Sequence, residues 1–250
     1  MQKSKLLSGI IIALTISFVG FQIFQVDFIG GIVRGLILPL LTILYCVTGK
    51  SKSNYFFYFL LFYSLSEFTS VFSYFAYHSV VVDNLLYYGG NICYITAYVF
   101  LMLEVLKSIK LKSVISKFPA HIIILLVLDI YSVYLVSEIA VKSDYLSNMT
   151  EYIIEIVYNI VVMLLLTVTL INYISRDSKK AMNLLLGALC IVFSEIMQVA
   201  YFYVSDKNIL NVTYSVLLIF AFCFFYIQAG MTYSRNEIYS NGSSLNNLET

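Results

Sequence analysis

Four ionisable side chains lie deep inside long apolar segments of this sequence: Arg34, Glu67, Asp129 and Glu195. A charge at membrane depth costs about 2.5 kcal/mol or more, so each such group needs a partner, a bound proton or a water-filled cavity. Carboxyl groups in that setting can transfer protons, bind a cation or act as acid and base. Two carboxylic acids are costly if they only hold helices together, so Glu67 and Glu195 are the first candidates for function.

The apolar segments that position these groups are long enough to cross a bilayer. Apolar residues make up 60% of the 250 residues and charged residues 12%, whereas soluble domains have about 45–50% apolar residues. A helical span needs about 20 apolar residues. Runs of that length occupy residues 6–25, 29–48, 54–78, 85–106, 118–137, 152–174, 181–204 and 210–232.

The sequence therefore predicts an all-α fold, a polytopic transmembrane helix bundle of about eight spans within residues 1–235. The polar segment 236–250 is expected to be a disordered cytoplasmic tail. Twelve Lys and Arg residues fall on the same side as the N-terminus, and only Lys142 and Lys207 fall in loops on the other side. Because basic residues favour the cytoplasmic side, we expect both termini to be cytoplasmic in a plasma (inner) membrane.

The two glutamates occupy similar positions in a weak internal repeat. Ser66-Glu67 is followed by Val71, and Ser194-Glu195 is followed at the same spacing by Val199. Both spans run from inside to outside, which is compatible with a 4+4 parallel repeat of the helices. Helical rise also puts the four ionisable residues at similar depths, roughly 18–24 Å from the cytoplasmic edge.

Polar neighbours indicate which helix faces point inwards. Asn91 and Tyr94 share one face of their span, and interhelical hydrogen bonding explains such residues as well as a binding role does. Glu155 is close to a span end, where its side chain is expected to reach the headgroups. The spacing Gly31-x-x-x-Gly35 predicts a close approach between two helices.

Other kinds of site have no support in the sequence. The four cysteines lie in apolar stretches without metal-ligand spacing, so neither a metal site nor a disulfide framework is expected. Glycine-rich phosphate loops, HExxH and GxSxG motifs are also missing, and no cofactor is expected. The net charge of +1 argues against a nucleic-acid partner and leaves the lipid bilayer as the expected environment.

Three segments resemble motifs of the lysoplasmalogenase-like family of eight-span membrane proteins. Residues 64–67 (Ser-Leu-Ser-Glu) resemble the motif of its third span, and residues 187–195 resemble that of its seventh. Gly90, Asn91 and Tyr94 resemble the segment of its fourth span. This chain has Glu where the family has Asp in both carboxyl motifs, and Asn91 where the family has His.

The resemblance implies a hydrolase that acts on the vinyl-ether bond of a membrane lipid, a lysophospholipid or lysoplasmalogen. Glu67 and Glu195 would then be the catalytic acid and base, in an order that the sequence leaves open. In the same reading, Arg34 and Asp129 tune that pair, and Asn91 and Tyr94 orient the substrate. Two other functions fit the same residues: a proton-coupled small transporter, and a non-catalytic lipid-binding membrane protein.

Overall fold

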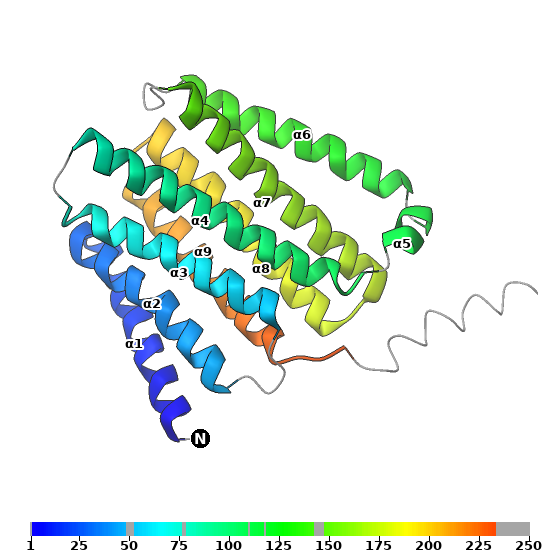
Figure 1. Cartoon of the computed structure of the whole chain (residues 1–250), viewed down its shortest axis with the longest axis horizontal. Coiled ribbons are helices and arrows are strands. Elements are labelled where there is room, and N and C mark those ends of the chain that lie inside the picture. Colours follow the sequence, from blue (N-terminus) through cyan, green and yellow to red (C-terminus); the bar gives the residue numbers. More distant parts are fainter. Residues whose placement is uncertain are drawn as a thin grey trace, which may run out of the picture.

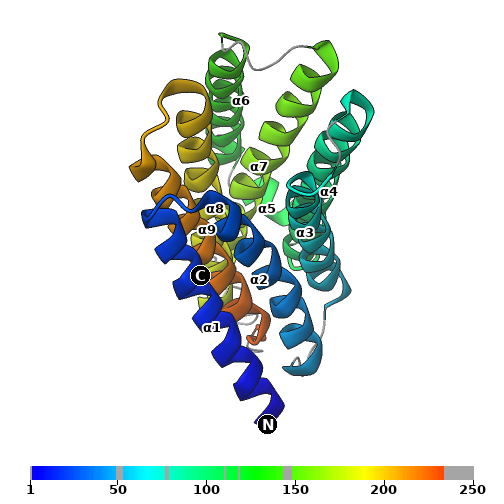
Figure 2. The ribbon, with the colours of Figure 1, turned by 90° about the vertical axis from the view of Figure 1, so that its left-hand side faces the viewer.

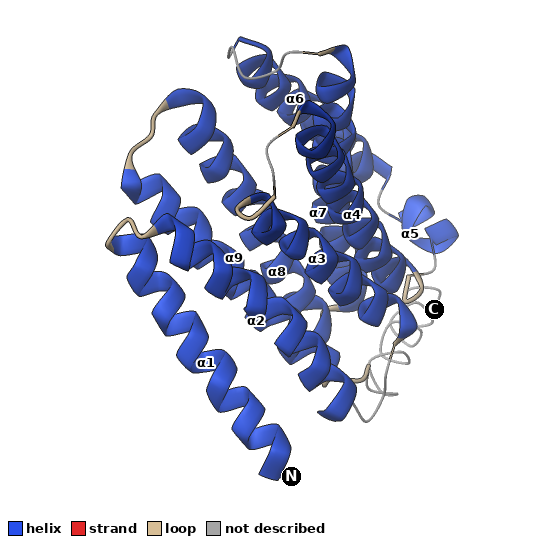
Figure 3. Ribbon diagram, turned by 60° about the vertical axis from the view of Figure 1, so that its left-hand side comes forward, coloured by secondary structure: helices blue, strands red, loops and turns tan. Residues whose placement is uncertain are grey.

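The computed structural model describes residues 2–48, 53–76, 79–109, 111–117, 119–142 and 148–233. These residues form helices and contain no strand (Figure 3). The elements are α1 (Gln2–Ile23), α2 (Asp27–Thr48), α3 (Asn54–Ser73), α4 (Val80–Leu106), α5 (Leu111–Lys117), α6 (Pro119–Lys142), α7 (Met149–Arg176), α8 (Lys179–Val199), the π-helix η1 (Ala200–Val204) and α9 (Asn208–Ala229). The fold is an all-α helical bundle.

Eight helices of the described chain are long and apolar enough to cross a bilayer, as the sequence predicts, and the chain is a multi-pass membrane protein. Two local features differ from expectation. The α4 helix begins at Val80, five residues before the predicted span, because the Ser79 side chain accepts a hydrogen bond from the Val82 amide and caps the helix. A short helix, α5, occupies part of a predicted loop. The predicted tail 236–250 lies outside the described residues.

Seven of the long helices form a closed ring, in which each helix packs against two neighbours (Figures 1 and 2). Around the ring, α1 contacts α2, α2 contacts α3, α3 contacts α4, α4 contacts α7, α7 contacts α8, α8 contacts α9, and α9 contacts α1. The α6 helix lies at the edge and packs mainly on α7. A side chain that points towards the centre of this ring can therefore meet residues distant in sequence.

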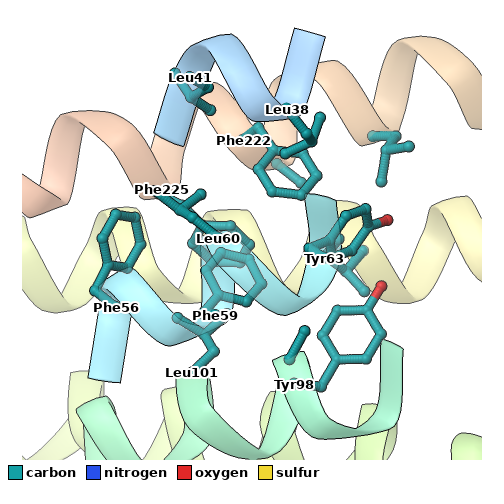
Figure 4. Packing of buried hydrophobic residues seen from close by; sticks show 14 of the residues in the cluster. Leu38, Leu41, Phe56, Phe59, Leu60, Tyr63, Tyr98, Leu101, Phe222 and Phe225 are labelled. Carbon is teal, nitrogen blue, oxygen red and sulfur yellow. The ribbon is translucent and has the colours of Figure 1, made fainter. Parts of the chain in front are cut away.

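Aromatic side chains fill the ring interior towards the end where α1 begins and α9 ends (Figure 4). The rings of Phe59 on α3 and Phe222 on α9 stack with their centroids 5.7 Å apart, and Phe225 meets Phe59 edge-on at 5.6 Å. Tyr63 follows one turn later on α3 and meets Phe222 edge-on at 4.7 Å. Offset and edge-on contacts of this kind stabilise a core beyond simple burial. The polar site lies beyond Tyr63, away from this end.

Basic residues at the ends of two helices gather at the end where α9 finishes. Arg176, the last residue of α7, donates a hydrogen bond to the Ser108 carbonyl after α4. Its guanidinium also lies 4.5 Å from the ring centroid of Tyr233, just beyond α9. Lys180 approaches the same ring to 5.2 Å. The charge pattern used to orient the spans thus corresponds to one physical end of the bundle.

Glycine allows α2 to lie against α3 at the level of Glu67. A Cβ atom on Gly35 would overlap the Val71 side chain, and one on Gly31 would lie 2.8 Å from the Tyr74 ring. The close helix approach expected from the Gly31-x-x-x-Gly35 spacing is therefore confirmed. This approach brings Arg34, the residue before Gly35, within reach of α3.

Candidate functional site

Arg34 and Glu67 form a two-pronged ion pair between α2 and α3. The Arg34 Nε donates to Glu67 Oε2 at 2.9 Å, and Nη2 donates to Oε1 at 2.9 Å. The Glu67 side chain is only 2% exposed, whereas that of Arg34 is 20% exposed. A bidentate pair in low dielectric fixes the direction of the guanidinium as well as its position. In the structure, Arg34 is therefore the counter-ion of Glu67 inside the bundle.

Tyrosines from two helices hold the two glutamates. Tyr94 on α4 donates a hydrogen bond to Glu67 Oε1 at 2.9 Å. One turn later on the same helix, Tyr98 donates to Glu195 Oε1 at 3.3 Å. Tyr158 on α7 donates to the same Glu195 oxygen at 2.6 Å. Both hydrogen bonds to Glu195 fall on Oε1, so Oε2 is the oxygen of this carboxyl that is available to a ligand or a proton.

Phenol rings in edge-on contact connect the residues that bond the two carboxyls. The Tyr63 ring lies 4.8 Å from that of Tyr94 and 5.9 Å from that of Tyr98, edge-on to both. Tyr98 in turn meets Tyr158 at 5.9 Å. Figure 4 shows Tyr63 and Tyr98 side by side, at the polar margin of the aromatic core. The two glutamates thus belong to one connected cluster of buried polar side chains.

A cavity of about 220 Å³ lies next to this cluster. Residues of α2, α3, α4, α7, α8, η1 and α9 surround it, namely Arg34, Tyr63, Tyr87, Asn91, Tyr94, Glu155, Tyr158, Ser194, Glu195, Gln198, Val199, Phe202, Tyr203, Tyr214 and Leu218. Glu195 forms part of the wall itself. Glu67 lies behind the wall, and its partners Arg34 and Tyr94 face the cavity in its place. The cavity can hold a polar group together with a water molecule.

Most of the predicted site residues meet here, and one does not. Arg34, Asn91, Tyr94 and Glu195 line the cavity, and Glu67 is bonded to two of them. Asp129 is buried between α6 and α7, where its Oδ2 accepts a hydrogen bond from Thr167 at 2.7 Å. It does not line the cavity. Since α6 lies outside the ring, similar depth in the bilayer did not mean proximity.

Glu155 has a different setting from the one expected. The sequence places it near a span end, with its carboxyl among the headgroups. In the structure it is half-buried on α7 and lines the cavity, with Asn159 donating to its Oε1 at 3.4 Å. The α7 helix starts at Met149, three residues before the predicted span, so Glu155 lies in the second turn of the helix and not at its end. The cavity wall therefore carries two carboxyls, Glu155 and Glu195.

The serine before each glutamate makes the same kind of contact. Ser66 Oγ on α3 donates to the Gly90 carbonyl on α4 at 2.8 Å, and Ser194 Oγ on α8 donates to the Tyr214 carbonyl on α9 at 2.8 Å. In each case the hydroxyl reaches the next long helix of the chain. Each contact fixes the rotation of its helix, and hence the direction of the adjacent glutamate. These matching contacts add a structural observation to the 4+4 repeat proposed from the sequence.

A second recess opens beside the cavity, between α3 and α4. It has a volume of about 360 Å³, and its wall includes Thr69, Ser70, Ser73 and Asp83. Three of its residues, Tyr87, Asn91 and Tyr94, also line the first cavity. The recess therefore lies on the other side of these three side chains from the cavity.

Within the described residues, no group of three or more His, Cys, Asp and Glu side chains is placed to hold a metal ion. The chemistry available to the cavity is that of carboxyl, phenol, amide and guanidinium groups. Such groups can transfer protons and bind an anionic or hydroxylated ligand. Comparisons of the chain with protein-family models, curated proteins and solved structures gave no match.

Proposed function

We propose that this membrane protein hydrolyses the vinyl-ether bond of a single-chain ether lipid, as the resemblance to lysoplasmalogenases implies. The observation that carries the proposal is the arrangement of Glu195 and Arg34 around one cavity, with Glu67 bonded behind Arg34. A proton donor and a fixed cation thus face the same small space. An anionic headgroup and an acid-labile bond are the ligand features that such a pair suits.

The reaction needs one proton donor and one water molecule. In the proposal, Glu195 transfers a proton from Oε2 to the β-carbon of the vinyl ether, which converts the double bond into an oxocarbenium ion. Water adds to that ion, and the hemiacetal that results splits into an aldehyde and an alcohol. One water is consumed, and the proton that the water loses restores the acid. Tyr98 and Tyr158 hold Glu195 through Oε1, so that Oε2 faces the substrate.

Glu155 is the group proposed to accept the proton from water. It shares the cavity wall with Glu195, and two carboxyls facing one small space are favoured when they hold a single proton between them. Glu67 is assigned a positioning role, because it lies behind the wall and acts through Arg34 and Tyr94. Arg34 binds the anionic part of the lipid, and Asn91 orients it.

The proposed location is the plasma (inner) membrane with both termini in the cytoplasm. The grouping of Arg176 and Lys180 at the end where α9 finishes supports this orientation. The cavity, which lies beyond Tyr63 from that end, would then be in the outer half of the bilayer. The lipid substrate would be drawn from that leaflet.

Release of fatty aldehyde from a lysoplasmalogen by the purified protein in nanodiscs tests the proposal. We expect release by the unmodified protein and a loss of about a hundredfold or more in Glu195→Gln, the range that general acid catalysis supplies. Glu104→Gln is the matched control, since Glu104 is a half-buried carboxyl near the end of α4 that bonds Ser53 and does not line the cavity. Aldehyde release that is equal in all three proteins would refute the proposal.

A proton-coupled small transporter is the second candidate, and η1 is the observation that favours it. This π-helix interrupts the regular helix after Glu195 and contributes Phe202 and Tyr203 to the cavity wall. Single-turn π-helices occur often at functional sites. Proteoliposomes with a pH-sensitive dye inside separate the two functions. Substrate-dependent proton uptake without any aldehyde would favour the transporter.

A further inference from the structure

A second cavity of apolar character lies between α1, α2 and α9. Its volume is about 230 Å³. The wall includes Ser8, Thr15 and Phe18 of α1, Arg34 of α2, and Leu218 and Tyr226 of α9. We call it the α1–α9 groove. The proposed reaction does not use it.

The few hydroxyl groups of α1 in this wall do not make it polar. Ser8 Oγ donates to the Ser4 carbonyl at 3.0 Å, and Thr15 Oγ1 donates to the Ile11 carbonyl at 2.8 Å. Both hydroxyls are thus bonded within their own helix. Tyr226, at the far end of the groove, shares a hydrogen bond with Thr48 at 3.2 Å. What remains for a ligand is a surface of methyl, methylene and ring carbons.

The groove and the polar cavity meet at two residues. Within the part of the chain that the structure describes, Arg34 and Leu218 are the residues that line both spaces. The hydrogen bonds of Arg34 to Glu67 use Nε and Nη2, so Nη1 is the nitrogen with which it can bind a ligand. A molecule that lies in both spaces would have an apolar part along the groove and a polar part beside Arg34.

The groove faces the bilayer. Its neighbour Ile16 on α1 is 68% exposed, Ile12 is 60% exposed, and Cys223 on α9 is exposed as well. Figure 3 shows α1 at the edge of the bundle, with α2 and α9 beside it. From Ser8 to Phe18 the wall extends about 15 Å along α1, at 1.5 Å per residue. In that environment an extended hydrocarbon chain is the abundant molecule of matching length and chemistry.

We propose that one hydrocarbon chain of a membrane lipid enters sideways between α1 and α9 and lies in the groove, with its polar end at Arg34. The inference rests on the proposed function only for the identity of that polar end. It makes α1 and α9 the gate through which the lipid reaches the cavity. It also makes the groove the part of the site that selects the length of the chain.

Photolabelling tests the groove without requiring turnover. The probe is a lysophosphatidylcholine with a diazirine near the middle of its chain, added to the purified protein in phosphatidylcholine nanodiscs. We expect labelled peptides from α1 and α9, with loss of the label when excess unmodified lysophosphatidylcholine is present. Labelling that is spread over lipid-facing helices such as α6, and that excess lipid does not reduce, would overturn the proposal.

Two neighbouring substitutions make the test specific. Thr15→Phe places a ring in the groove, whereas Ile16→Phe places the same ring on the exposed side of α1. Thr15→Phe is expected to weaken groove labelling roughly tenfold, which corresponds to about 1.4 kcal/mol of binding free energy. Ile16→Phe is expected to label like the unmodified protein. Equal labelling of both variants would count against the groove.

The same experiment separates this inference from the proposed reaction. Glu195→Gln is expected to be labelled normally, because Glu195 does not line the groove. If the unmodified protein is labelled in the groove and releases no aldehyde, the reaction is refuted and the groove proposal stands. Aldehyde release at the same rate in Thr15→Phe and the unmodified protein, without groove labelling, would refute the groove alone.

Discussion

Tyr94 and Tyr98 lie one turn apart on α4, and each donates a hydrogen bond to a different glutamate. Tyr94 bonds Glu67 of α3, and Tyr98 bonds Glu195 of α8. A single face of α4 therefore sets the relative position of two carboxyls that are 128 residues apart in the sequence. Since helical residues four apart share a face, the spacing of the two phenols follows from the helix itself once α4 packs against α3 and α7.

The two tyrosine bonds to Glu195 are expected to contribute unequally. Tyr158 donates at 2.6 Å and Tyr98 at 3.3 Å, and the shorter bond holds the carboxyl more firmly. Glu195 becomes negatively charged as it gives up its proton, and removing a hydrogen bond to a charged group costs about 1.5–3 kcal/mol. We therefore predict that Tyr158→Phe lowers kcat for aldehyde release by roughly tenfold or more. Tyr98→Phe should lower it less. A reversed order would show that Glu195 is held in another way.

The Arg34–Glu67 ion pair is predicted to affect stability separately from activity. Glu67→Gln leaves the guanidinium without its counter-ion, which costs on the order of 3 kcal/mol in a buried pair. Its thermal unfolding temperature in detergent should therefore fall. The double variant Arg34→Met/Glu67→Met removes both charges, and its unfolding temperature should recover towards that of the unmodified protein. Its aldehyde release should remain lost, because Arg34 binds the lipid headgroup. A Glu67→Gln protein as stable as the unmodified one would contradict this account.

The α2–α3 contact can be tested with two substitutions, of which the second is expected to restore what the first removes. Gly35→Ala adds a methyl group that overlaps the Val71 side chain, so α2 must move away from α3. The unfolding temperature and the activity should both fall, because the Arg34–Glu67 bonds lengthen. Val71→Ala removes the overlapping atoms and should restore both properties in the double variant. If Val71→Ala leaves the Gly35→Ala defect unchanged, the close approach is not its cause.

Asp129 is predicted to matter for folding and not for turnover. Its carboxyl bonds Thr167 between α6 and α7 and lies outside the cavity wall. Asp129→Ala leaves the buried Thr167 hydroxyl without its acceptor and should lower the unfolding temperature. The kcat of the folded fraction should match that of the unmodified protein. A large loss of kcat at normal stability would return Asp129 to the candidate site.

Composition and periodicity were sufficient for the fold class and for the eight long helices. An apolar run of about 20 residues in a bilayer has few conformations available other than a helix, because a helix bonds every backbone group within its own segment. A close contact between α2 and another helix was also predictable from Gly31 and Gly35, although the sequence did not identify α3 as the partner. Helix order around the ring was not predictable. That order depends on side-chain packing between segments far apart in the chain.

The candidate site shows which features could be predicted from the sequence and which could not. Depth along a helix follows from residue counting, and it placed Glu67, Glu195, Arg34 and Asp129 at one level. Which of them meet depends on where each helix lies around the bundle and which way its side chains face. Asp129 lies on α6, which packs outside the ring. Glu155 was misplaced for a related reason: the apolar run begins after the helix itself does. The Tyr94–Tyr98 spacing was the available signal that one helix touches both glutamates.

Turnover of a lysoplasmalogen in D₂O tests the central claim most directly. If Glu195 protonates the β-carbon, the released aldehyde gains one deuterium on the carbon next to the carbonyl, in equal amount to the glycerophospho-alcohol product. The aldehyde is trapped as soon as it forms, and mass spectrometry then measures the deuterium on that carbon. The account predicts singly labelled aldehyde from the unmodified protein and none from Glu195→Gln. Intact lipid recovered from a protein that binds it, or aldehyde formed without carbon-bound deuterium, would contradict it.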